Sequence, residues 1–307
     1  MTDGGQSGSI PAAGQGDHWP TTVAALTSLQ ENVSRRIGSR VDFGRPEPTY
    51  EWRREKMTTE EMVVDVSQDW VLACDVQQGF MQAPCSVSDS FDYSARCRQI
   101  RALGGDCCSA LPLKDDCMAL VVGDASGKGL AAALMIANVQ SSLRTAVLFT
   151  GDDLAALLKA VNHQVYASSS ENRYATMFYG VFDGSTRILR YVNAGHNPPI
   201  VIRRDGSMHC LETGGAPVGL FPDSEYGEGS IELETGDLVF AFTDGLIEAA
   251  NQDGEEWGVH GLLKAAACGA QCPQDAGDLV DLIFTSMDDF SKKHETDDAT
   301  LAVVRVI

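Results

Sequence analysis

The chain has 307 residues, of which 44% are hydrophobic and 21% charged, so it can bury a sizeable core. Its formal net charge of −20 argues against nucleic acid or an anionic membrane surface as partner, because both attract Lys and Arg. The nine cysteines include no C-x-x-C pair, and none is followed six residues later by Arg, which excludes the usual zinc patterns and a cysteine-nucleophile phosphatase.

The beginning of the chain has neither a basic start nor an apolar run. No stretch approaches the roughly 18 apolar residues that a membrane helix needs. We therefore expect a cytoplasmic protein with reduced thiols.

The N-terminal third divides into three predicted segments. Residues 1–19 are rich in Gly, Ser, Gln and Pro and should form a disordered tail. Residues 20–57 should form an amphipathic helix and a linker. Residues 58–84 should form a linker helix, or stalk, because Thr58 and Glu61 make a capping box at its start and Pro84 ends it.

The stalk has an apolar residue every three or four positions, which places these residues along one side of a helix. They are Met62, Val66, Trp70, Ala73, Val76 and Phe80. Two interpretations remain open: this stripe packs on the domain that follows, or it pairs with a second copy of the chain and makes a homodimer through residues 58–82.

Residues 85–307 predict one domain in which short strands alternate with long helices. We expect strands at Tyr93–Gln99, Cys117–Val122, Ala175–Phe182, Ile188–Asn193, Ile200–Arg203, Leu238–Phe242 and Leu301–Ile307. We expect helices at Leu130–Phe149, Asp152–Ser168, Val259–Cys268 and Gln274–Ser291. Consecutive hairpin strands and clustered helices indicate an α+β fold and not a parallel sheet.

Aspartates recur beside strand ends or glycine turns in this domain. Asp106 lies in LGGDCC, Asp124 in VVGDASGKG, Asp244 in VFAFTDGL, and Asp297 and Asp298 in ETDDATLAVV. A strand end is a rigid place for a carboxylate, and carboxylates gathered from several strand ends suit Mg²⁺ or Mn²⁺ better than zinc. Any single one of these aspartates could be structural, but together they predict a metal site.

The order and wording of these segments resemble the protein phosphatase 2C (PPM) family, in its bacterial branch of SpoIIE and RsbU phosphatases. The resemblance runs from about Ala73 to Ile307 and includes VVGDASGKGLAAALMIANVQSSLR, NRYATMFYGVFD, LRYVNAGHNPPIVIRRDG and LVFAFTDGLIEAANQDGEEWG. It implies an α-β-β-α sandwich of two antiparallel sheets flanked by helices, preceded by N-terminal helices. It also implies two divalent cations, Mn²⁺ or Mg²⁺.

The resemblance assigns roles to individual residues. Asp124 matches the aspartate that bridges both metals, and the carbonyl of Ala125 matches a ligand of the second metal, near which Asp106 lies. Asp244 and Asp297 match ligands of the first metal, and Asp298 holds a neighbouring place and acts directly or through water. Asp106, Asp124 and Asp244 are the predicted catalytic residues; the substrate-binding residues are not predicted.

Four residues near these motifs leave two interpretations open. Cys107 and Cys108 replace an aromatic pair that this branch often has, and they are expected to be small core residues, with an oxidation-sensitive site as the alternative. His196 is expected to brace the turn before Pro198, with general acid catalysis as the alternative. Lys128 could meet a substrate phosphate or be solvated at a helix start.

The implied function is hydrolysis of phosphoserine or phosphothreonine on a protein. By resemblance, the substrate is a STAS-domain antagonist of an anti-sigma factor in partner-switching signalling. The alternatives are a catalytically inactive scaffold of the same fold and a two-metal phosphodiesterase or nuclease, which the charge of −20 disfavours. A diguanylate cyclase matches only in the letters GGD.

Overall fold

The computed structural model describes residues 59–80, 86–113, 116–150, 152–170, 172–270, 275–293 and 296–307. All of them belong to one compact unit, Trp52–Ile307. The expected disordered tail, the first amphipathic helix and the Thr58 cap lie outside the described residues. Within the described ranges, no helix is long and apolar enough to cross a membrane.

Two six-stranded sheets form the centre of the unit. In spatial order, sheet A contains β1 (Ser86–Val87), β2 (Phe91–Arg98), β12 (Ala299–Val306), β11 (Leu238–Phe242), β7 (Ile200–Ile202) and β8 (Met208–Cys210). Sheet B contains β10 (Gly229–Glu232), β6 (Ile188–Ala194), β5 (Ala175–Asp183), β4 (Cys117–Ala125) and β3 (Asp106–Pro112), with β9 (Gly214–Gly215) beside β6. Every pairing is antiparallel except that of β6 with β9.

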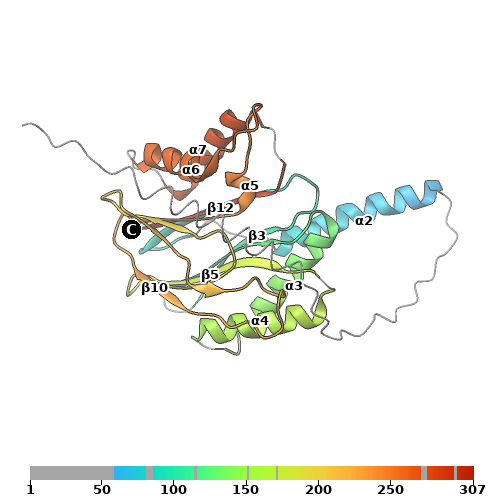
Figure 1. The fold of residues 1–307 in the computed structure, drawn as a ribbon, viewed down its shortest axis with the longest axis horizontal. Helices are drawn as coiled ribbons and strands as arrows, with labels where there is room; N and C mark the ends of the chain where they lie inside the picture. Colours follow the sequence, from blue (N-terminus) through green and yellow to red (C-terminus); the bar gives the residue numbers. More distant parts are fainter. Residues whose placement is uncertain are drawn as a thin grey trace, which may run out of the picture. The chain divides into compact units, whose positions relative to one another are not determined.

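Helices cover both outer faces of the paired sheets (Figure 1). They are α3 (Leu130–Ala146) and α4 (Leu154–Ser168) against sheet B, and α5 (Asp244–Ile247), α6 (Gly258–Ala270) and α7 (Ala276–Ser291) against sheet A. The four layers bury three apolar clusters: one between α3, α4 and sheet B, one between the sheets, and one between sheet A and the C-terminal helices. The predicted α-β-β-α sandwich is confirmed.

Alternating side chains explain why the strands can serve two cores at once. Along β3, Cys107 faces the α3 layer, whereas Cys108 and Ala110 face the other sheet. β3 was absent from the prediction because Cys, Ser and Ala carry little strand propensity. Packing on both faces, and not local preference, makes this segment a strand.

The predicted helices are present with shifted ends. Asp153 caps α4, since its Oδ1 accepts a hydrogen bond from the Ala156 N–H at 2.8 Å. The α3 helix ends at Ala146 and not at Phe149, because the N–H groups of Leu148 and Phe149 bond to carbonyls three positions earlier. Leu148 and Phe149 are therefore 75% and 81% exposed.

The long helix before the domain, α2 (Thr59–Phe80), is present, but its predicted stripe is not one buried face. Val76, a member of the stripe, is 63% exposed. Its neighbours Val71 and Leu72 are 68% and 62% exposed. Among the side chains of α2 that the structure describes, residues 69–80, the buried one is Gln77. Its Nε2 donates to the Gly104 carbonyl at 2.7 Å, and its Oε1 accepts from the Gly104 N–H. The hydrogen bonds of Gln77 therefore hold the end of α2 to the loop before β3. The pattern of apolar residues in the sequence does not predict this contact. The side chains of Met62 and Val66 lie outside the described residues.

Candidate metal centre

The predicted aspartates lie at one end of the two sheets, although they come from four segments of the chain. Asp106 begins β3 and stands directly opposite Asp124 of β4 in the antiparallel register. Asp244 begins α5 directly after β11, and Asp297 directly precedes Asp298 and β12, the neighbour of β11 in sheet A. The sandwich thus brings carboxylates of both sheets to the same edge.

Asp106 and Asp124 face each other across the β3–β4 pair as neighbouring carboxyl groups. Burial, and then the charge of Asp124, raises the pKa of Asp106 well above its usual range. Burial, and then the charge of Asp244, raises the pKa of Asp124 to about 8. Two carboxyl groups this close share protons as a coupled pair. The excess of negative charge is what a bound cation would neutralise.

Asp244 extends this negative field towards sheet A. Burial raises its pKa to about 6, with Glu248 and Asp297 as the next causes, while Lys128 opposes the shift. The helix α5 can approach Asp298 so closely because residue 245 is glycine: a Cβ there would lie 2.0 Å from the Asp298 carbonyl oxygen. The TDG motif therefore marks a place where two backbone segments touch.

Two threonines, Thr243 at the start of α5 and Thr300 of β12, fix the Asp106 carboxylate of sheet B. Both Thr243 Oγ1 and Thr300 Oγ1 donate to Asp106 Oδ2, each at 2.7 Å. The Thr300 N–H in turn donates to Thr243 Oγ1 at 2.9 Å. All three residues are buried, so these bonds set the spacing of the two sheets at the site.

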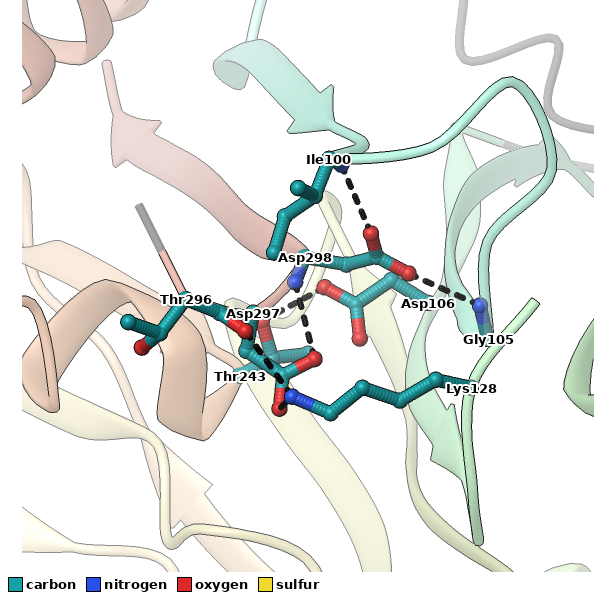
Figure 2. A network of polar contacts seen from close by, with 8 residues as sticks. All are labelled: Ile100, Gly105, Asp106, Lys128, Thr243, Thr296, Asp297 and Asp298. Carbon is teal, nitrogen blue, oxygen red and sulfur yellow. Dashed lines mark hydrogen bonds and ion pairs between the residues drawn. The ribbon is translucent and has the colours of Figure 1, made fainter. Parts of the chain in front are cut away.

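Asp298 uses both carboxylate oxygens on the backbone. Its Oδ1 accepts from the Ile100 N–H at 2.8 Å, and its Oδ2 accepts from the Gly105 N–H at 2.9 Å (Figure 2). In this structure Asp298 shapes the loop between β2 and β3. Gly104 is required there, because a Cβ would lie 2.4 Å from Asp298 Oδ2. A direct metal bond from Asp298 stays a prediction.

Lys128 places its ammonium group at this edge. Its Nζ lies 2.5 Å from Asp297 Oδ2 and donates to the Thr296 carbonyl at 2.9 Å (Figure 2). Asp297 Oδ1 also accepts from the Asp298 N–H at 3.0 Å. The side chains of Lys128 and Asp297 are 49% and 36% exposed, so this ion pair lies at the rim of the site.

The donor set fits hard divalent cations, because it consists of carboxylates and backbone carbonyls with surplus negative charge. Within the described ranges, no three His, Cys, Asp or Glu side chains stand in a ready-made cage. The carboxylates have protein partners instead: threonines at Asp106, backbone N–H groups at Asp298 and Lys128 at Asp297. Ala125 lies at the same edge, because its backbone N–H donates to the Gly105 carbonyl at 3.0 Å. The Ala125 carbonyl is therefore also near the site.

His196 is buried behind this edge. Its ring nitrogen Nδ1 is 2.9 Å from Thr176 Oγ1. The backbone N–H of His196 donates to Asn193 Oδ1 at 2.7 Å. Burial lowers its pKa to about 4, so the ring is neutral at pH 7. A neutral imidazole held between two strands fits the expected bracing role and not a protonated general acid.

The two thiols are core residues, as expected. Cys107 is fully buried, and Cys108 is 3% exposed with its Sγ 3.3 Å from the Tyr93 hydroxyl. Burial raises the pKa of Cys108 to about 12 and that of Cys107 well above its usual range. Thiols with such high pKa values are poor nucleophiles at neutral pH. Whether oxidation affects the site stays a prediction.

Three residues of the site were not predicted from the sequence. Thr243 directly precedes Asp244, and Thr300 follows Asp298 by two positions. Threonine is common in strands, so its presence there does not indicate a functional site. Gln77 lies on a different element. The ion pair of Lys128 with Asp297 joins residues far apart in the chain, and only the fold brings them together.

Comparison with known proteins identifies relatives of this chain. Residues 114–307 match the family model "Stage II sporulation protein E (SpoIIE)". The phosphoserine phosphatase RsbU of Bacillus subtilis is 24% identical over 82% of this chain and 74% of its own length. Protein IcfG of Synechocystis sp. is 26% identical over 67% of this chain, which spans only 36% of that longer protein.

Solved structures share the fold. The RsbU and RsbW domains of Rv1364c from Mycobacterium tuberculosis are 28% identical, with a TM-score of 0.61 over 71% of this chain and 61% of that one. The catalytic domain of the serine threonine protein phosphatase PstP, solved in complex with 2 manganese ions, has a TM-score of 0.53 at 19% identity over 71% of this chain and 99% of that one.

Proposed function

Because the chain belongs to the SpoIIE family, in the RsbU-like branch of the PPM phosphatases, we propose that it is a metal-dependent phosphatase of phosphoserine and phosphothreonine in proteins. The observation that carries the proposal is the meeting of Asp106, Asp124, Asp244 and Asp297 at one edge of the sandwich, where burial and neighbouring carboxylates raise the pKa of Asp106, Asp124 and Asp244. An inactive scaffold would have no need to keep carboxylates in such an unfavourable cluster.

The residues that would hold two Mn²⁺ or Mg²⁺ ions are Asp106, Asp124, the Ala125 carbonyl, Asp244 and Asp297. When bound, such ions lower the pKa of a water and neutralise charge that develops on the phosphoryl oxygens. The manganese complex of PstP supports this choice of cofactor.

The protein's own part in the reaction is to position these groups. Asp124 stands between the carboxylates of both sheets and is the proposed bridging ligand. Thr243 and Thr300 hold Asp106 in one orientation, and Asp298 holds the loop whose Gly105 carbonyl contacts Ala125. Such fixed groups need little rearrangement as charge develops on the substrate.

For the substrate we propose a small phosphorylated STAS-domain protein, in cytoplasmic partner-switching signalling. The support is the relation to RsbU, named a phosphoserine phosphatase, and to a chain that joins RsbU and RsbW domains. The net charge of −20 supports a protein substrate over nucleic acid.

Substrate class can be tested by comparing three compounds at equal concentration with Mn²⁺. They are a phosphorylated STAS-domain protein, an unrelated phosphoserine peptide and a DNA duplex. We expect phosphate release from the STAS protein to be fastest, from the peptide slower, and no DNA cleavage. DNA cleavage that disappears in Asp244→Asn would replace this assignment by a nuclease. Equal rates on protein and peptide would remove only the STAS proposal.

A further inference from the structure

Lys128 reaches from one sheet's helix layer to the other sheet. It lies between Gly127 and Gly129, directly before α3, and its ammonium group contacts Thr296 and Asp297 just before β12 (Figure 2). Gly127 and Gly129 have φ angles of +96° and +72°, in the region that favours glycine. The backbone is therefore shaped to place one lysine at the carboxylate edge.

The carboxylate that Lys128 binds sets it apart from the other paired cations. Arg96 binds Asp281 and Arg98 binds Asp288, both on α7. Lys159, Arg190 and Arg203 bind Glu225, Glu228 and Asp237, so all five partners lie outside the predicted metal ligands. Lys128 instead neutralises Asp297, a proposed ligand, and its charge also acts on Asp244. Among these ion pairs of the described residues, that of Lys128 is the one that includes a proposed metal ligand.

We propose that Lys128 is a built-in competitor of the divalent cation: its ammonium group occupies Asp297 Oδ2 when the metal is absent and must leave that oxygen when the metal binds. The inference rests on the proposed metal-dependent function. It assigns to Lys128 the role of setting the metal concentration at which the protein becomes loaded.

The physical reason is repulsion between two cations that share one carboxylate. An ammonium 2.5 Å from Asp297 Oδ2 would lie a few ångströms from a metal on the same oxygen. Lysine can leave without moving α3, since its four-carbon stem is flexible and its side chain is already half exposed. Because the ion pair is at the rim, its removal should strengthen metal binding only ~2- to 5-fold, the range of exposed ion pairs.

The test is direct measurement of Mn²⁺ binding to the full chain by isothermal titration calorimetry, without substrate. Lys128→Met removes the charge but keeps an unbranched apolar stem. Lys128→Arg keeps a cation at the same place. Lys159→Met is the matched control, because Lys159 pairs with Glu225 away from the site. Circular dichroism and a thermal melt of each metal-free variant show that it is folded.

We expect Lys128→Met to bind Mn²⁺ ~2- to 5-fold more tightly than the wild type, and the other two variants to bind like the wild type. Equal or weaker binding by folded Lys128→Met, while the wild type binds Mn²⁺, would overturn the competitor role and leave Lys128 as a structural link to Thr296. Failure of every variant and of the wild type to bind Mn²⁺ would instead contradict the proposed function itself.

Discussion

Single residues at the carboxylate edge show why motif spacing alone was informative. Gly104 of GGD and Gly245 of TDG each face an atom of Asp298 at a distance that excludes a Cβ. The aspartates could thus be found from their setting. Their hydrogen-bond partners Thr243 and Thr300 could not be predicted, because they reach Asp106 only when the two sheets pack together.

His196 predicts a measurable dependence of stability on pH. Its pKa of about 4 in the folded chain lies below the ordinary value of 6.5, so between these pH values the unfolded chain binds the extra proton. This contribution to stability is present above pH 6.5 and is lost as the pH falls towards 4. Between pH 7 and pH 5 the loss should be about 2 kcal/mol.

Urea unfolding at both pH values measures this contribution when the wild type is compared with His196→Gln and His196→Asn. Both variants lack the titrating ring, so their stability should fall less on acidification. If all three proteins lose the same free energy between pH 7 and pH 5, His196 does not titrate as the buried geometry requires.

Cys107 and Cys108 predict a stability effect without an effect on turnover. Replacement of both by Ala removes two buried sulfur atoms and the contact with Tyr93, which should lower the free energy of unfolding by about 2 kcal/mol. Metal-dependent turnover per folded molecule should stay within twofold, a ~0.4 kcal/mol difference. Peroxide that inactivates the wild type and spares the double variant would show a redox role.

Among the elements, α2 connects the site to the N-terminal part of the chain. Its Gln77 binds Gly104, two residues before Asp106, and its Phe80 carbonyl accepts from Arg144 of α3 at 3.0 Å. Hydrogen bonds thus link the end of this helix to both the ligand loop and the helix that begins after Lys128. A change in the position of α2 can therefore reach the site.

The exposed apolar side of α2 carries the prediction of a homodimer through residues 58–82. Val71, Leu72 and Val76 expose more than half of their side chains, which favours burial against a second copy. Light scattering over a range of concentrations should show a dimer, and Leu72→Lys with Val76→Lys should shift it to monomer. Met208→Lys, on the exposed edge strand β8, is the control and should stay dimeric.

A wild type that is monomeric at every concentration would contradict the dimer. Trp70→Ala then separates the remaining roles of the helix: loss of thermal stability alone would leave α2 as a packed cover of the domain. Loss of Mn²⁺-dependent activity at full stability would still connect α2 to the site.

Prediction from the sequence was most reliable for elements with strong periodicity. Strand β11 and helices α3, α4 and α7 were predicted from their apolar runs. Strand β3 and the short edge strands β8 and β10 did not, because their residues have weak strand preferences and pair only after the sheets form.

At the scale of the whole molecule, the fold explains how an acidic chain can gather still more negative charge at one point. The two sheets are joined by an apolar core, and the aspartates lie at the edge of that core, where backbone segments of both sheets end. The core therefore supplies the stability that offsets the repulsion among carboxylates. This arrangement could be predicted only through the resemblance, since no local pattern shows which strand ends meet.

In the proposed function, Asp124 and its neighbours hold the metal on which phosphate release depends. The most direct measurement is the rate of phosphate release from a phosphoserine protein in Mn²⁺, for the wild type with and without EDTA and for folded Asp124→Asn. We predict that EDTA abolishes the rate and that Asp124→Asn lowers it at least ~100-fold. Undiminished phosphate release by either the EDTA-treated protein or the variant would contradict a metal-dependent reaction at Asp124.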